Sequence, residues 1–437
     1  MENLLKENIK KTSRKSAESI KKLLKKRWFV VIIALLLTGL GASITSESFK
    51  TGIYYINNWR LELLNKFPSF FVLPLFGLVG GAVSGLLIKN FAPAAKGSGV
   101  SQIMGFLRHK EVPMNLKVGL IKLISGIVAI GSGFPLGPEG PSVQMGGSVA
   151  WQMAKWLRAP VSFRRVIVAA GGGAGIAAVF SAPLGGFVYA IEELLNSARP
   201  VILLLVIVTT FIADSSAIFL QGGIDEPTYK IDFLFSRFDF INLVLLGGII
   251  GIIAEIYSKY ILMMQNLGKK LYKNKFVLKM SICGFILGSI YSILGDKFHD
   301  LDNLKKMIAT QTDINIGLAI LTVFVLFITS GLAAASGAPG GLFYPMLILG
   351  GSIGLILGSW SWIPSTALST YVFAGMGAFV AGCSRTPITA MFLAFALTKN
   401  LLIMKPVLIT CITSFLVARA LHEKSIYERQ IEIELEK

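Results

Sequence analysis

The chain contains the same Gly- and Pro-rich break twice, and both copies lie between long apolar stretches. The first copy, 131–149, reads GSGFPLGPEGPSVQMGGSV, and the second begins 204 positions after Ser132 as SGAPGGLFYPMLILGGSI. Ser, Gly and Pro residues coincide along the two copies without a gap, and the same offset relates Gly171 to Gly375. An echo sustained over this distance predicts two homologous halves, which in an apolar chain indicates a transporter built from a repeat.

The surroundings of the two breaks are apolar enough for a bilayer. The chain is 54% hydrophobic and 15% charged, against about 45–50% and about 25% for an average soluble domain. Several apolar runs reach the length of about 20 residues that crosses a bilayer core: Trp28–Ile44, Phe70–Ile88, Val201–Leu220, Ile241–Met263 and Ile316–Leu332. Irregular backbone at membrane depth survives only where it is buried in protein or lines a wet cavity. The two breaks are therefore the first candidates for a binding site in a polytopic membrane protein.

The formal net charge of +18 has a topological explanation. Many of the basic residues lie in the first 27 positions, without the interleaved aromatic side chains that a nucleic-acid surface would need. The positive-inside rule assigns such a cluster to the cytoplasm, so we expect a cytoplasmic N-terminus and no nucleic-acid partner. The three cysteines form no close pair, which predicts neither a disulfide framework nor a metal site.

Composition divides the chain into five parts. These are a basic cytoplasmic segment (1–27), a first transmembrane repeat (28–220), a link (221–239), a second transmembrane repeat (240–422) and a short acidic cytoplasmic tail (423–437). Two further stretches, Ser46–Phe67 and 295–315, are predicted to be polar loops.

The first break places a carboxylate at the start of a helix. Pro135 and Pro138 forbid a continuous helix, whereas Glu139 can begin one that runs on through Pro141, since proline is tolerated in a first turn. A helix N-terminus carries partial positive charge and unpaired N–H donors, and so favours an anion. A charge at the centre of a membrane helix costs about 2.5–3.5 kcal/mol on insertion scales, so such groups are usually functional. The alternative is a loop glutamate at the water interface.

The second break lacks an acid. Leu342 and Phe343 stand where the first copy has Pro138 and Glu139. The backbone N–H groups of this break are thus free to face a ligand.

Three other features have both a functional and a structural interpretation. The turn at 97–99, Gly-Ser-Gly, either opens a helix near Ser101 with free N–H groups or is an ordinary loop. Lys122 lies in an apolar stretch and needs either a partner or a path to the interface. Glu192 and Glu193 end an apolar helix, either as functional acids or as solvated charges.

Together these residues resemble the CLC family of chloride channels and proton/chloride antiporters. Four stretches in the same order carry the resemblance, which covers about residues 28–430: Gly97–Val100, Gly137–Pro141, Gly341–Pro345 and Tyr427. The resemblance implies an all-α fold of two inverted repeats of tilted and broken helices.

The resemblance also implies a chloride site. Ser98 would offer its hydroxyl and Tyr427 its phenol to a central anion, with Gly99 in the same loop as Ser98. The backbone amides of Leu342 and Phe343 would complete the shell. Chloride is the expected anion because the nitrate-preferring members of the family carry Pro at the position of Ser98.

A proton path is implied as well. Glu139 would be the gating glutamate at the external site, on the helix N-terminus formed by Pro138, Glu139 and Gly140, and its carboxylate would compete with chloride until protonated. Glu193 matches the internal glutamate that passes protons in antiporters, with Glu192 beside it. Family channels generally lack an acid at that position, so we expect a proton-coupled chloride antiporter and keep a passive channel as the alternative.

The resemblance further implies a homodimer with one pore per subunit in the inner (plasma) membrane, with chloride and protons as substrates and no cofactor or metal. The length leaves no room for cytoplasmic regulatory domains, which suggests a prokaryotic type. The sequence departs from the family pattern at Pro138, which replaces an arginine, and at Val100 and Ser101, which replace Ile-Pro.

A third possibility is an intramembrane enzyme, because Gly350–Gly354 matches the G-x-S-x-G nucleophile pattern around Ser352. All three histidines lie in charged segments, so a base at membrane depth is missing. We therefore expect a transporter and not an enzyme.

Overall fold

The computed structural model describes residues 2–195, 199–222, 229, 239–271, 275–359 and 368–435. Within these ranges the fold is helical and contains no β-strand. The α-helices in chain order are α1 (Glu2–Leu64), α2 (Ser69–Phe91), α3 (Val100–Leu107), α4 (Leu116–Gly131), α5 (Glu139–Trp156), α6 (Val161–Phe180), α7 (Pro183–Tyr189), α8 (Pro200–Leu220), α9 (Asp239–Leu271), α10 (Phe276–Leu294), α11 (Leu301–Thr310), α12 (Ile316–Ser336), α13 (Phe343–Gly358), α14 (Leu368–Ser384), α15 (Pro387–Thr398), α16 (Met404–Leu421) and α17 (Ile426–Leu435). The expectation of an all-α fold is confirmed.

Two predicted loops are wrong. Ser46–Phe67 was expected to be a polar loop, but α1 continues as far as Leu64. Aromatic residues of this stretch such as Tyr54 and Trp59 are exposed on the helix, whereas Ser46 and Arg60 are buried in the fold. The polar and aromatic residues therefore belong to the last turns of a long helix and not to a loop. The second predicted loop, 295–315, contains the short helix Asp296–Phe298 and α11. The predicted link between the halves lies mostly outside the described residues.

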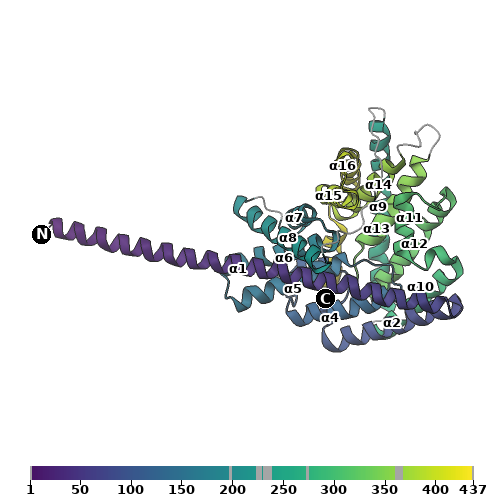
Figure 1. The fold of residues 1–437 in the computed structure, drawn as a ribbon, viewed down its shortest axis with the longest axis horizontal. Helices are drawn as coiled ribbons and strands as arrows, with labels where there is room; N and C mark the ends of the chain where they lie inside the picture. The colour runs from purple at the N-terminus through teal and green to yellow at the C-terminus, as the bar shows by residue number, and fades with distance from the viewer. Residues whose placement is uncertain are drawn as a thin grey trace.

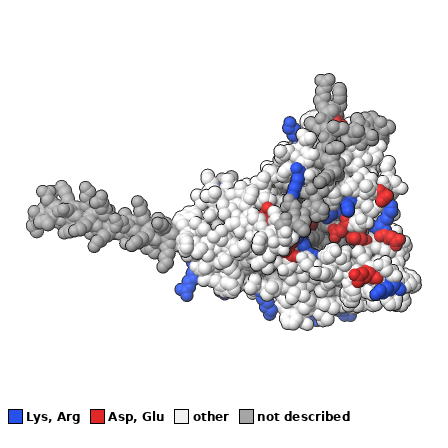
Figure 2. All heavy atoms as spheres, in the orientation of Figure 1, with Lys and Arg blue, Asp and Glu red and all other residues white. Residues whose placement is uncertain are grey.

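Eight helices within the described ranges are long and apolar enough to cross a membrane. Figure 2 shows a broad face with few charged side chains, of which the acids gather mainly towards the right-hand edge. Large apolar side chains are exposed along these helices, for example Phe70 on α2 and Phe324 on α12. Such a surface suits lipid and not water, so the chain is a multi-pass membrane protein.

The two halves repeat the same helix contact. A Cβ added at Gly146 on α5 would lie 2.1 Å from the carbonyl oxygen of Gly171 on α6, and a Cβ added at Gly350 on α13 would lie 2.2 Å from that of Gly375 on α14. Both partners are offset by the same 204 positions. Glycine lets the backbones of each pair touch, so the sequence echo corresponds to a repeated packing unit.

The halves meet at the two breaks. In Figure 1 most helices of the first half, purple to teal, occupy the left and lower parts of the view, and most of the second, green to yellow, the upper right. Gly137 and its counterpart Gly341 form an antiparallel bridge in which each N–H donates to the other's carbonyl, at 2.9 and 2.7 Å. A reciprocal contact between equivalent residues is what a two-fold relation produces, in keeping with two inverted repeats.

Candidate anion and proton sites

The bridge between the breaks brings two helix N-termini together. α5 begins at Glu139 and α13 at Phe343, each two residues beyond its bridge glycine. The first N–H groups of a helix have no partner within the helix and carry its positive pole. Two such poles from opposite halves therefore point into one small region of the protein interior.

A third N-terminus reaches the same region. α3 begins at Val100, after Gly99, whose φ of +100° lies in the left-handed region that favours glycine. A Cβ at Gly99 would lie 2.4 Å from the carbonyl oxygen of Gly140, and a Cβ at Gly140 would lie 2.4 Å from that of Ser98. The two glycines thus allow the Ser98 loop to touch the first turn of α5. The start of α3 at Val100 decides between the two interpretations of the 97–99 turn, which does open a helix.

Lys122 on α4 is hydrogen-bonded to the backbone of this loop. Its side chain is fully buried, and its ammonium group donates to the carbonyl oxygens of Ala95 and Gly97 at 3.0 and 2.5 Å. The partner interpretation of Lys122 therefore holds, and not the path to the interface. A buried lysine bonded to two carbonyls fixes the loop and adds positive charge beside it.

Glu139 lies at the meeting point of the helix ends. The residue is 2% exposed, and its carboxylate is folded back so that Oε2 would lie 1.9 Å from a Cβ added at Gly137 and 3.1 Å from one added at Gly341. Oε2 has no hydrogen-bond partner. A carboxyl group thus occupies the place towards which the backbone dipoles converge. Its neighbour Pro138 offers no N–H there.

The other predicted anion ligands lie in the same region. The Ser98 hydroxyl and the Tyr427 phenol are both buried, and neither has a hydrogen-bond partner. Leu342 and Phe343 are buried at the start of α13, and the Tyr427 ring stacks on the Phe343 ring with 6.0 Å between centroids. Buried polar groups are almost always hydrogen-bonded in native proteins, so two unpaired hydroxyls that lie close to converging helix N-termini are candidates for ligand-binding groups.

Sequence reasoning missed Tyr189 at the end of α7. Its ring packs edge-on against Phe343 with 6.1 Å between centroids, and its buried hydroxyl also has no partner. No motif marks this tyrosine, because it reaches the site only through the packing of α7.

A cavity of about 270 Å³ adjoins Glu139, and its charged lining was also missed. Lys50 and Arg60 of α1 and Lys305 of α11 line it together with Pro138. Burial lowers the pKa of the His299 imidazole in the same wall, so that ring tends to be neutral. Asp300 and Asp302 line the same cavity, so its charged lining carries both signs, and Lys50, Arg60 and Lys305 are the groups in it that attract an anion.

A second cavity, of about 290 Å³, holds Glu193. Glu193 is 6% exposed, and its Oε1 accepts a hydrogen bond from the Ser425 hydroxyl at 3.5 Å. Glu192 lines the cavity too, but its carboxylate accepts from the N–H groups of Ile388 and Thr389 at 3.2 and 2.9 Å. Glu192 thus caps the first turn of α15, whereas Glu193 has no comparable structural task.

A third cavity, of about 620 Å³, is basic. Lys96, Lys269, Lys270 and Lys279 line it, and its lining includes no acid among the residues that the structure describes. Gly97, which precedes the predicted anion ligand Ser98, forms part of its wall. The cavity combines side chains from four separate parts of the chain, which no local pattern could reveal.

The enzyme alternative finds no support at Ser352. Its hydroxyl is fully buried and has no hydrogen-bond partner, so no base activates it. Helix N-termini that converge from two repeated halves, within a multi-pass membrane protein, are instead typical of a membrane transport protein with its binding site at the repeat interface.

The comparison with known proteins gives the family. A family model described as voltage gated chloride channel matches residues 80–419, so the chain belongs to this family, the CLC family. The H(+)/Cl(-) exchange transporter ClcA of Vibrio parahaemolyticus is 30% identical over 426 residues, which cover 92% of this chain and 89% of the relative.

Solved structures agree. The crystal structure of a slow cyanobacterial Cl-/H+ antiporter matches with a TM-score of 0.84 and 28% identity, covering 93% of this chain and 98% of that one. A CLC-type fluoride/proton antiporter, 19% identical, matches with a TM-score of 0.79 over 92% of this chain and 97% of its own, and shows the same fold. The expectation of a CLC transporter and not an enzyme is confirmed.

Proposed function

We propose that this protein exchanges chloride for protons across the membrane and that Glu139 is the gate. One observation carries the proposal: the buried Glu139 carboxylate, with Oε2 unpaired, lies where the N-termini of α5 and α13 converge beside the Ser98 loop. A place that stabilises a carboxylate by helix dipoles and N–H donors also stabilises chloride. The names of ClcA and of the cyanobacterial antiporter support proton/chloride exchange.

The gate works by competition between two anions. Ionised Glu139 holds the outer position and excludes chloride from it. Protonation removes the charge, so the side chain loses its attraction to the helix poles and swings into the adjoining cavity, where chloride replaces it. Because one position accepts either the carboxylate or chloride, every chloride that passes requires a change in the protonation of Glu139, and this couples the two fluxes.

The central anion is bound without a cation or cofactor. The hydroxyls of Ser98 and Tyr427, unpaired in the folded chain, donate to it, and the amides of Leu342 and Phe343 complete the shell. Gly99 shapes the loop beside Ser98, and its own N–H donates to Oε1 of Gln102 at 2.8 Å. Hydrogen bonds to an ion are stronger than those between neutral groups. The lysine-lined cavity beside Gly97 supplies anions to this site from the other side of the membrane.

Protons take a separate route through Glu193. Its carboxyl group lies in its own cavity, which also contains Arg108 and Glu428, and so exchanges protons with solution without meeting the chloride route. Glu192 assists by holding α15 through its N-terminal cap.

We further propose a homodimer with one pore per subunit in the inner (plasma) membrane, with the basic N-terminus in the cytoplasm. The cluster of lysines and arginines before Trp28 supports this orientation. Light scattering of the purified protein in detergent tests the dimer, and a monomeric mass would contradict it.

Exchange is tested in liposomes that carry a chloride gradient, with the membrane potential clamped so that a passive proton leak predicts no net flow. We expect chloride to drive proton movement in the wild type. Glu139→Ala and Glu193→Ala should abolish proton movement while chloride still passes. Glu62→Ala, which removes an exposed glutamate at the end of α1, is the matched control and should exchange normally.

Two outcomes would contradict the proposal. Rapid chloride flux without any proton response in the wild type would make the protein a passive channel. Intact coupling in Glu139→Ala would show that another group is the gate.

A further inference from the structure

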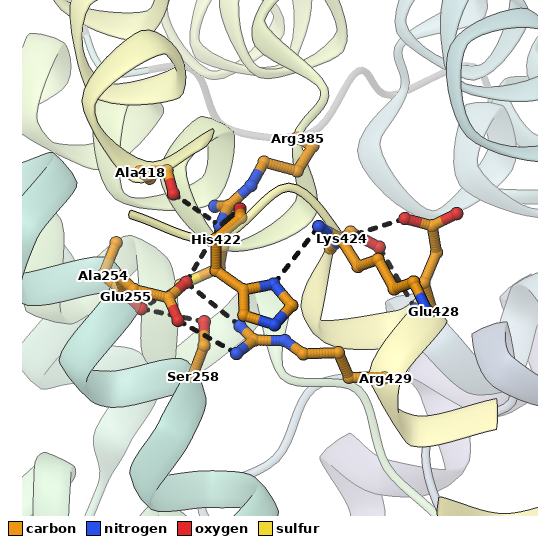
Figure 3. Close-up of polar contacts among 11 residues, drawn as sticks. Ala254, Glu255, Ser258, Arg385, Ala418, His422, Lys424, Glu428 and Arg429 are labelled. Carbon is orange, nitrogen blue, oxygen red and sulfur yellow. Dashed lines mark hydrogen bonds and ion pairs between the residues drawn. The ribbon is translucent and has the colours of Figure 1, made fainter. Parts of the chain in front are cut away.

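A buried cluster of charges lies away from the anion site. The carboxylate of Glu255, in the middle of α9 and 1% exposed, accepts hydrogen bonds from two arginines. Arg429 of α17 approaches it with both terminal nitrogens, at 2.9 and 3.1 Å, and Arg385 donates to Oε2 at 2.9 Å. Figure 3 shows the two guanidinium groups on either side of this carboxylate.

The cluster joins four parts of the second half. Arg385 lies in the turn between α14 and α15 and also donates to the carbonyl oxygens of Ala418 and His422 at the end of α16, at 3.0 and 2.9 Å. Its φ of +64° is one that residues with a side chain rarely adopt. α9, the α14–α15 turn, the end of α16 and α17 are thus held by one carboxylate and its two partners.

Stability alone is a weak reason to keep such a cluster. Buried ion pairs replaced by well-packed apolar residues are often neutral or more stable, because both charges lose their hydration. Removing one partner, however, leaves an uncompensated buried charge and is strongly destabilising. The cluster therefore enforces one arrangement of its helices more than it stabilises the fold.

The start of α17 and the residue before it contact both candidate sites. Tyr427, two residues before Arg429, stacks on Phe343 at the anion site. Ser425, just before α17, donates to Glu193 in the other cavity, at 3.5 Å. The segment 425–429 therefore touches the anion site, the Glu193 cavity and Glu255 within five consecutive residues.

We propose that Glu255 is a positioning residue that holds α17 through Arg429 and Arg385, so that movement at Tyr427 is matched to protonation at Glu193. The inference rests on the proposed exchange of chloride for protons. When the clamp is loosened, the start of α17 shifts, Tyr427 no longer follows the anion, and chloride passes without its proton.

The test compares proton and chloride fluxes in liposomes for Glu255→Gln and Arg429→Lys. Glutamine keeps the shape of Glu255 but not the charge, and lysine keeps the charge of Arg429 but not the paired geometry. We expect chloride flux to stay within a few-fold of the wild type while protons moved per chloride fall by at least half. Chloride affinity, measured by calorimetry, should fall in parallel. Arg429→Lys keeps the test open if Glu255→Gln does not fold.

The matched control is the ion pair between Lys424 and Glu432, which involves the same helix but is about half exposed. Exposed pairs contribute about 0–1 kcal/mol, so Glu432→Gln should leave the coupling ratio unchanged. An unchanged ratio and chloride affinity in folded Glu255→Gln and Arg429→Lys would overturn the inference, as would equal uncoupling in Glu432→Gln. A wild type that moves no protons would instead refute the proposed exchange, and the chloride affinities would still test whether the clamp positions Tyr427.

Discussion

The repeated helix contact makes a quantitative prediction that depends on both halves at once. A methyl group at Gly146 or Gly350 would meet a backbone carbonyl oxygen at 2.1 or 2.2 Å, where ordinary contact begins at 3.4 Å. Each helix pair would have to separate by about 1.2–1.3 Å in the Gly→Ala variants. Overpacking costs about 1–3 kcal/mol, and a rigid backbone partner puts these sites at the upper end. Alanine has a helix propensity about 1 kcal/mol more favourable than that of glycine, so the free energy of unfolding should fall by about 2 kcal/mol at each site.

Denaturant unfolding of Gly146→Ala and Gly350→Ala in detergent, followed by tryptophan fluorescence, measures this loss. Gly248→Ala on α9 is the control, because a Cβ there meets nothing within 4 Å. The control should gain about 0.5–1 kcal/mol. Because α5 and α13 carry Glu139 and Phe343, both test variants should also transport more slowly. If only one variant is destabilised, the two halves are not packed equivalently, and if neither is, the close contact is absent.

Three further predictions concern the anion site. Tyr427→Phe removes a hydroxyl that has no protein partner, so the free energy of unfolding should not change. The Kd for chloride should rise about ten- to a hundredfold, because a hydrogen bond to an ion contributes about 1.5–3 kcal/mol. An unchanged Kd in calorimetry would exclude the phenol as a ligand. Lys122→Met leaves the carbonyls of Ala95 and Gly97 without this donor, and each unpaired carbonyl costs about 1–3 kcal/mol. We therefore expect a lower free energy of unfolding and weaker chloride binding. Normal chloride binding would show that the loop keeps its shape without Lys122. Pro138→Arg adds an N–H and a positive side chain beside Glu139, and should lower the external chloride concentration for half-maximal exchange; an increase would mean that proline shapes the first turn of α5.

The starts of the helices could be read from the sequence because proline and glycine act locally. Pro138, Glu139 and Pro141 together permit a helix to begin at Glu139 and not earlier, and α5 begins there. The echo aligns Phe343 with Glu139, and in the structure α13 begins at Phe343. The boundary at Glu139 needed only a few neighbouring residues.

Features that depend on distant contacts were not predictable. Arg60 lies in a stretch expected to be a loop, but its guanidinium donates to the carbonyl oxygen of His299, 239 positions away, in the wall of the cavity that adjoins Glu139. Tyr189 and Glu255 carry no motif, and their environments come from helices that meet only in the fold. An apolar helix with one polar residue predicts that the residue has a partner, but it does not identify which one.

The two halves provide the same backbone and different side chains, and this difference is what exchange requires. At equivalent positions the first half has Glu139 and the second has Phe343, while both supply a helix N-terminus to one region. With an acid in both halves, two like charges would compete for the same pole and one would stay protonated. With an acid in neither half, the site would bind anions but no proton. A single carboxylate at one of two convergent helix ends therefore gives the proposed site one titratable competitor for chloride. Its side chain can leave towards the cavity lined by Arg60 and Lys305, and in the proposed mechanism chloride and protons reach the gate from the side of the membrane to which this cavity opens.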